Sequence, residues 1–266
     1  MRRVACCSPL LAWDAVAELK EAVRGFWESE PCGSTLTQLE PGSVEYYEDI
    51  ERKRYALEPF IPSFAEFHRW RGKRVLEVGV GLGSDFVNFA RAGAELSGVD
   101  LTEAAVTNVR RRLELEGLEA NVQRADAESL PFEDGAFDLV YSWGVLQHTP
   151  DTERAVAEVH RVTRPDGQAR IMLYGRHSWV ALGLWGRHEL LHGRPFTSLG
   201  ESVARHMQGP RVKSYTEDEI RALLAPHFSR VELRRFLTPY DKRVGGPLAG
   251  ALGDRFGWFI GAIAQV

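Results

Sequence analysis

The hydrophobic positions of the first seventy residues recur at helical spacing. Between Trp13 and Trp27, apolar residues stand three or four positions apart, which predicts an amphipathic helix. A second helix is expected from a cap at Ser43 to about Leu57, and a shorter one over residues 63–70. We therefore expect residues 1–70, called the N-terminal segment below, to form a helical prelude to the main domain.

From residue 73 onward, short apolar runs alternate with helical patterns. Strands are expected over 73–78, 94–100, 120–125, 137–142 and 168–174, and helices over 84–92, 102–116 and 151–162. The turn Arg164-Pro165-Asp166-Gly167 is expected to end before the fifth strand begins. Such alternation implies a parallel sheet with helices on both faces.

This alternation stops between residues 175 and 214, which are rich in Arg, His, Trp and Gly. We expect these residues, called the insertion below, to lie over the carboxyl edge of the sheet. A capping box at Thr216 then begins a helix that ends near Leu224. Two strands follow, over 228–237 and 257–265, and the Gly-Gly-Pro at 245–247 permits only a short helix between them.

Charge and cysteine content narrow the class of protein. The chain has 266 residues and a net charge of −4, which argues against bulk attraction to nucleic acid or to a membrane, although it leaves room for a local basic patch. Cys6, Cys7 and Cys32 lack metal-ligand spacing and fit a reducing, cytoplasmic setting. Pro9 and Asp14 interrupt the apolar start too early for a signal peptide. The apolar stretch 244–266 contains charges and is interpreted as a buried terminal strand.

Three candidate ligand-binding motifs lie at the ends of successive strands. The run from Glu77 to Gly83 reads Glu-Val-Gly-Val-Gly-Leu-Gly and joins a strand to a helix, so a ligand can lie against bare backbone. Asp100 stands about twenty residues later, where a carboxylate can accept hydrogen bonds from ribose hydroxyls. Asp126 follows the third strand and could accept one from an adenine amine.

These motifs, together with 130–140 and the run Ser142-Trp143-Gly144-Val145-Leu146-Gln147-His148, resemble the class I S-adenosylmethionine-dependent methyltransferases, in the group that includes the ubiquinone-biosynthesis C-methyltransferases. The resemblance is close over 73–174 and looser to the end of the chain. It implies a doubly wound, mostly parallel, seven-stranded Rossmann-like α/β sheet with an antiparallel last strand. It also implies a methyltransferase domain over 71–266 and S-adenosylmethionine as cofactor, with S-adenosylhomocysteine as product.

The resemblance assigns roles to residues of this chain. Glu77 would buttress the turn, and the cofactor's methionine part would lie against Gly79, Gly81 and Gly83. Asp100 would bind the ribose and Leu101 would pack on the adenine, whose edge Asp126 and Ala127 would hold. Ser142 and Trp143 would supply backbone near the sulfonium. In such enzymes the prelude often closes over the cofactor, which makes Tyr46, Tyr47 and Arg54 lid candidates, with Arg54 toward the carboxylate and Tyr47 toward the substrate.

Candidate residues for the methyl acceptor follow the fourth and fifth strands. His148 stands where a base could face the transferred methyl, or it could cap or pack at a loop. Basic and aromatic residues of the insertion indicate either a solvated face or a cap over an acceptor with an apolar body and an anionic group. Tyr174, His177 and Trp179 are the further substrate-binding candidates. His188 and His192 have half of a metal-site spacing but no third ligand, and no metal is expected.

The prediction is methyl transfer to a small molecule at oxygen, nitrogen or carbon. An NAD-dependent oxidoreductase is the first alternative, but its fingerprint needs glycine where Ser84 stands. A catalytically silent cofactor-binding protein is the second alternative. The acidic net charge makes a protein or tRNA acceptor less favoured than a small molecule.

Overall fold

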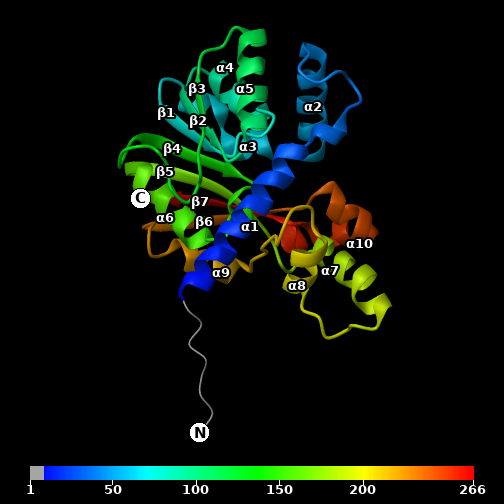
Figure 1. Ribbon diagram of the computed structural model, residues 1–266. Helices are drawn as coiled ribbons and strands as arrows, with labels where there is room; N and C mark the ends of the chain where they lie inside the picture. The colour runs from blue at the N-terminus through cyan, green and yellow to red at the C-terminus, as the bar shows by residue number, and fades with distance from the viewer. Residues whose placement is uncertain (1–8) are drawn as a thin grey trace.

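The computed structural model describes residues 9–266, with side chains from residue 16 onward, and contains one seven-stranded sheet in the order β3-β2-β1-β4-β5-β7-β6 (Figure 1). Strands β1 to β5 pair in parallel, and β7 runs antiparallel to both β5 and β6. This confirms the predicted fold class. The strands are β1 Arg74–Val78, β2 Glu95–Asp100, β3 Asn121–Arg124, β4 Phe137–Trp143, β5 Thr163–Tyr174, β6 Arg230–Phe236 and β7 Phe259–Gln265. Cys6 and Cys7 lie outside the described residues.

Helices precede, alternate with and follow these strands. The α-helices are α1 Pro9–Ser29, α2 Val44–Leu57, α3 Ile61–Ala65, α4 Ser84–Arg91, α5 Glu103–Glu116, α6 Thr152–Val162, α7 Trp179–His188, α8 Leu199–His206, α9 Glu217–Leu224 and α10 Pro239–Leu252. The short 3-10 turns are η1 Ser34–Leu36, η2 Phe67–Trp70, η3 Leu146–His148, η4 Leu190–His192 and η5 Gly253–Phe256. The predicted caps Ser43, Thr102 and Thr216 each accept a hydrogen bond from the backbone of their helix. None of the helices within residues 9–266 is both long enough and apolar enough to cross a membrane.

The two faces of the sheet are covered by different helices. Along β4, Leu139 and Tyr141 join a core cluster with Phe86 of α4, whereas Val140 joins a second cluster with Val156 of α6. This alternation follows from the two-residue period of a strand, which sends successive side chains to opposite faces. Hydrophobic clusters therefore pack on both faces of the sheet. The edge at the carboxyl ends of its parallel strands remains available for a ligand.

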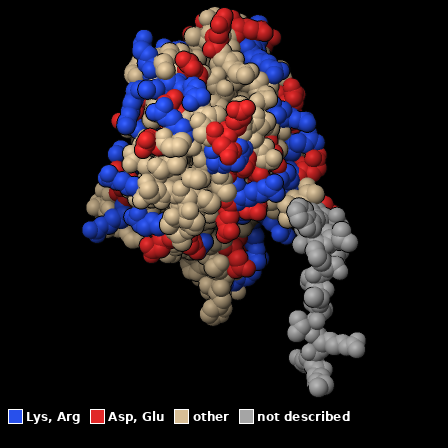
Figure 2. All heavy atoms as spheres, turned by 90° about the vertical axis from the view of Figure 1, so that its left-hand side faces the viewer, with Lys and Arg blue, Asp and Glu red and all other residues tan. Residues whose placement is uncertain are grey.

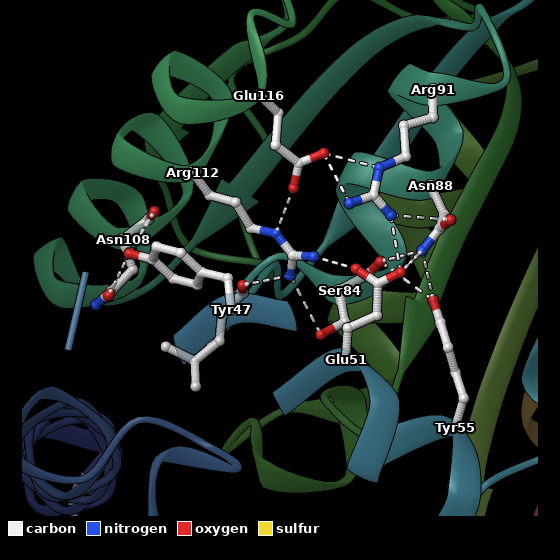
Figure 3. A network of polar contacts seen from close by, with 10 residues as sticks. Tyr47, Glu51, Tyr55, Ser84, Asn88, Arg91, Asn108, Arg112 and Glu116 are labelled. Carbon is white, nitrogen blue, oxygen red and sulfur yellow. Dashed lines mark hydrogen bonds and ion pairs between the residues drawn. The ribbon is translucent and has the colours of Figure 1, made fainter. Parts of the chain in front are cut away.

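A polar network joins helix α2 to the sheet-covering helices α4 and α5 (Figure 3). The fully buried guanidinium of Arg112 in α5 contacts Glu51 of α2 and donates from Nε to Glu116 at 3.0 Å. The ring of Tyr47 lies 5.5 Å from the Arg112 Cζ, and its hydroxyl donates to the Asn108 carbonyl at 3.1 Å. A buried guanidinium requires such partners, so this network anchors the N-terminal segment.

Three element predictions need correction. The expected helix over 63–70 is split into α3 and η2, because Glu66 adopts a left-handed φ of 51° while its carboxylate pairs with the buried Arg170. The turn before the fifth strand lies inside β5 as an irregularity, with Asp166 at φ 62°. Helix α10 spans fourteen residues despite the Gly-Gly-Pro sequence, because Gly246 takes a non-helical φ of 54° and Pro247 restarts the helix beyond that kink. Residues 244–252, expected in a terminal strand, are thus helical.

The insertion is more regular than expected. It contains α7, η4 and α8, and a buried carboxylate, Glu189, joins them. Glu189 accepts from Thr197 at 3.2 Å and contacts Arg194 at 2.9 Å and His206 at 3.0 Å. Some basic residues of the insertion therefore stabilise the insertion itself by pairing with Glu189.

Candidate functional site

A cavity of about 310 Å³ lies at the carboxyl ends of β1, β2 and β4. The strand order reverses between β1 and β4, and such a switch point is where open α/β sheets bind ligands. Its volume falls in the usual range for a small-molecule site. The predicted residues that line it are Glu77, Gly79, Gly81, Gly83, Arg54, Asp100, Leu101, Asp126, Ala127, Trp143, His148 and Tyr174.

The glycine turn after β1 forms the floor of this cavity. Gly79 adopts φ 84°, and a Cβ there would collide with a methyl carbon of Val145. Gly83 has φ 76° and precedes the first residue of α4. Positive φ and close packing explain why glycine is needed, and the resulting bare backbone faces the cavity.

Asp100 at the end of β2 is held in place by its own turn. Its Oδ1 accepts from the Thr102 amide at 3.0 Å and from the Thr102 hydroxyl at 2.8 Å. Its Oδ2 accepts from the Gly81 amide at 3.2 Å. Burial raises the pKa of Asp100 and these hydrogen bonds oppose that effect. The carboxylate is thus preorganised beside the glycine turn, as a ribose-binding group must be.

An acidic and a basic residue, Glu77 and Arg54, flank the same turn. Burial and the nearby charge of Asp85 raise the pKa of Glu77 well above its usual range, and its Oε2 is buried without a hydrogen-bond partner. Arg54 of α2 pairs with the buried Asp85 at 2.9 Å, while its buried Nε has no partner. Tyr55 and Tyr141 complete the shell by donating to Asp85 at 3.0 Å. A buried acceptor and a buried donor therefore remain open beside the cavity.

The adenine end of the predicted site contains a residue that the sequence did not single out. Lys20 of α1 contacts Asp126 and Glu128, each at 2.6 Å. Partial burial lowers the pKa of Lys20, but the two carboxylates outweigh this effect and leave the pKa raised. Further along α1, Glu28 accepts from the backbone of Glu103 and Ala104 at the start of α5. Helix α1 is thereby fixed over the ends of β2 and β3, an arrangement that no local signal in the sequence indicates.

His148 lies in η3, in the wall of the cavity. Its ring packs edge-on against Trp27 of α1 at 5.3 Å and Tyr174 of β5 at 5.9 Å. Burial lowers the pKa of His148 to about 4, and its Nδ1 is buried without a partner. The imidazole is therefore neutral at physiological pH, and its unpartnered Nδ1 lies beside Gly209.

A second group of residues missed at the sequence level lies near Trp143. The Trp143 indole donates at 2.7 Å to Glu58, which directly follows α2, and burial raises the pKa of this carboxyl group. Tyr240 of α10 and the free thiol of Cys32 also line the cavity. These residues come from three segments far apart in sequence, and none belongs to a recognisable motif.

Five predicted residues lie outside the cavity lining. Ser142 is fully buried within β4, and Tyr46 packs in a small core with Ile50 and Leu82. Tyr47 belongs to the Arg112 network described above. The remaining two are in the insertion: His177 is exposed, and the Trp179 ring packs against Phe256 at 5.9 Å. Their roles in binding cofactor or substrate stay predictions.

The insertion contributes a single residue, Gln208, to the cavity lining. Several of its other polar groups contact one another or neighbouring elements, as with Arg176, which pairs with Glu219 at 2.8 Å. The rings of His188 and His206 stack at 4.4 Å. Within residues 9–266, no group of three His, Cys, Asp or Glu side chains is placed to hold a metal ion. The basic residues of the insertion thus do not line this cavity, and their role as a cap over the acceptor stays a prediction.

Comparisons with known proteins agree with this architecture. The family profile described as "Methyltransferase domain" matches residues 76–171. A demethylmenaquinone methyltransferase of Thermus thermophilus is 30% identical over 217 residues, covering 76% of this chain and 96% of the relative. An uncharacterised protein of Mycobacterium tuberculosis is 32% identical over 172 residues, and the match spans 59% of its length.

Solved structures show the same fold. An S-adenosylmethionine-dependent methyltransferase of Mesorhizobium loti superimposes with a TM-score of 0.57 at 20% identity, over 78% of this chain and 97% of that one. On the strength of the Thermus relative and the matching domain profile, the chain belongs to the class I methyltransferases, with S-adenosylmethionine as cofactor.

Proposed function

We propose that this protein transfers the methyl group of S-adenosylmethionine to a small molecule bound between Trp143, His148 and Tyr174. The observation that supports this most strongly is the cavity itself. It joins the glycine turn and Asp100 at one end to an aromatic wall and a neutral histidine at the other. One cavity thus brings together the groups that a cofactor and an acceptor would need.

The residues present fit S-adenosylmethionine. The methionine part carries an ammonium and a carboxylate, which the open Glu77 Oε2 and the open Arg54 Nε would complement. Asp100 would accept the ribose hydroxyls, and the bare backbone at Gly79 and Gly81 would lie against the methionine chain. The cofactor supplies an electrophilic methyl on a positive sulfur.

The protein's part in the reaction is positioning and exclusion of water. Trp143 and Tyr174 would hold the acceptor's apolar body, with its nucleophilic atom in line with the methyl. Where that atom carries a proton, the imidazole of His148, which lines the cavity, would receive it. The low pKa keeps the imidazole unprotonated at neutral pH, and it also makes the ring nitrogen a weaker base than a free imidazole.

The chemistry of the cavity narrows the acceptor class. The basic side chains of the insertion do not line it, and Arg54 is already paired with Asp85. Near Trp143 the lining instead offers the Glu58 carboxyl group and the hydroxyls of Tyr174 and Tyr240. We therefore favour an uncharged or cationic acceptor with an apolar body over the anionic one that the sequence suggested.

Titration calorimetry followed by a transfer assay tests this function. S-adenosylhomocysteine is expected to bind with micromolar or better affinity, whereas NAD is expected to give no heat. A panel of small hydroxyl- and amine-bearing aromatics, with bulk tRNA alongside, is then assayed for release of S-adenosylhomocysteine. Binding of NAD alone would support the oxidoreductase. Cofactor binding with no acceptor in any class would support the silent protein.

We further propose that α1 acts as a lid, because Lys20 joins it to Asp126 and Glu128. Lys20→Met is expected to raise the dissociation rate of S-adenosylhomocysteine about fivefold, since a partly exposed ion pair contributes about 1 kcal/mol. Stopped-flow displacement measures this rate. Arg24→Met removes an exposed ion pair from the same helix and is the control. Equal rates for the two variants would argue against the lid.

A further inference from the structure

Exposed apolar side chains concentrate on one part of the molecule. Of twelve large hydrophobic side chains that are exposed in the described part of the chain, three lie in the N-terminal segment. The other nine form what we call the apolar rim: Leu182, Leu190, Leu191, Phe196, Tyr240, Val244, Leu248, Leu252 and Phe256. Two of them, Phe196 and Leu191, are 99% and 79% exposed. Such a concentration is unusual for a surface that faces only water.

The rim is continuous across elements distant in sequence. Helices α7 and α10 pack together, with Gly183 of α7 against the side chain of Val244 and Gly245 of α10 against the ring of Trp179. η4 follows α7 directly and carries Leu190 and Leu191. Figure 1 shows α7, α8 and α10 gathered on the same side of the molecule, away from α4 and α5.

The charges around the rim are mostly positive. Within 182–196 and 239–256, the acids Glu189 and Asp241 are fully buried. Asp254 is the exposed acid of these two ranges, and the exposed cations are Arg187, Lys242, Arg243, Arg255 and Arg194, of which Arg194 is paired with Glu189. The whole chain has a net charge of −4, so this excess is local. On the face shown in Figure 2, which is the left-hand side of Figure 1, acidic and basic side chains are intermixed.

We propose that the apolar rim docks on an anionic lipid membrane. Apolar side chains flanked by Lys and Arg are suited to the boundary between headgroups and acyl chains, because the cations attract anionic lipids while the apolar groups insert. A second copy of this chain fits less well. An isologous dimer through this face would set its five cations against the same five. The earlier expectation of no membrane contact rested on net charge, which averages over this patch.

The rim also reaches the cavity. Tyr240 of α10 lines the cavity and is 39% exposed on the rim. Docking would therefore place one wall of the cavity close to the lipid surface. The docking itself does not depend on methyl transfer, so it can be tested without knowing the acceptor.

Vesicle co-sedimentation with the full chain tests the proposal. At 0.1 M salt, binding to phosphatidylcholine vesicles with 30% phosphatidylglycerol is expected to be at least tenfold tighter than to pure phosphatidylcholine. High salt is expected to weaken it. Equal binding to both vesicles, or binding to neither, would overturn the proposal.

Variants separate the apolar and charged contributions. The double variant Leu191→Ser with Phe196→Ser and the double variant Lys242→Glu with Arg243→Glu should each reduce vesicle binding about tenfold or more. All four side chains are exposed, so unchanged thermal unfolding is expected. Leu39→Ser, an exposed apolar change outside the rim, is the control. Undiminished binding in both double variants would overturn the proposal. So would a concentration-dependent dimer that the apolar variant abolishes, in the absence of vesicle binding.

Discussion

Replacing Asp100 with asparagine is expected to weaken S-adenosylhomocysteine binding about 100-fold, measured by titration calorimetry. Hydrogen bonds to a charged acceptor contribute about 1.5–3 kcal/mol each, and a ribose offers two hydroxyls to this carboxylate. The asparagine side chain is nearly the same size as that of aspartate, so the turn retains its packing. One of its terminal atoms is a donor, which faces donors from Thr102 or Gly81 and repels them.

Glu103→Gln is the matched control, since it neutralises an exposed acid three residues further on, in the first turn of α5. Its cofactor affinity should equal that of the wild type. Thermal unfolding of Asp100→Asn with and without ligand separates a binding defect from an unfolded protein. An affinity within threefold of wild type would mean that Asp100 is a structural cap and not a ribose ligand.

The cofactor half of the site was predictable because its signals are local. Each of Glu77, Asp100 and Asp126 lies at or just beyond the end of a strand, and a parallel sheet brings such carboxyl ends to one edge. Glycine at 79 is required by a positive φ and by the side chain of Val145. The glycine seen in the sequence at this position is therefore the residue that the fold requires there.

The acceptor half could not be predicted in this way. Helical spacing predicts that Tyr47 is in a helix, but its partner, the Arg112 guanidinium, comes from another helix. Likewise, basic residues of the insertion suggest an anion site until the buried Glu189 is seen to engage Arg194. Side-chain partners across tertiary contacts leave no periodic signal in sequence.

The neutral state of His148 has a consequence for stability. Its pKa is about 4 in the fold and near 6.5 when unfolded, so the unfolded chain binds the proton more strongly. Stability attributable to this residue is therefore present above pH 6.5 and is lost as the pH falls toward 4. The loss amounts to about 3 kcal/mol, because one pKa unit corresponds to about 1.4 kcal/mol.

Replacing His148 with alanine is expected to lower turnover 10²- to 10⁴-fold with an acceptor that must lose a proton, the range typical of general-base catalysis. Cofactor affinity should change less than threefold, since the His148 ring packs on Trp27 and Tyr174 and not on the glycine turn. In the wild type, turnover should stay level from pH 8 to about pH 5.5, because the imidazole remains neutral throughout. His160→Ala, at a partly buried histidine that packs on Phe228, is the control.

The effects of His148→Ala on turnover and on KM separate a base from a packing residue. A base predicts that His148→Ala loses turnover without a matching rise in KM, whereas lost packing against Trp27 and Tyr174 would raise KM and disturb acceptor binding. The variant should also lose the wild type's fall in stability between pH 6.5 and pH 4, whichever role is correct. A fall in turnover of less than tenfold would leave His148 as part of the aromatic wall. Proximity and orientation would then account for methyl transfer without a base, as an already activated leaving group allows.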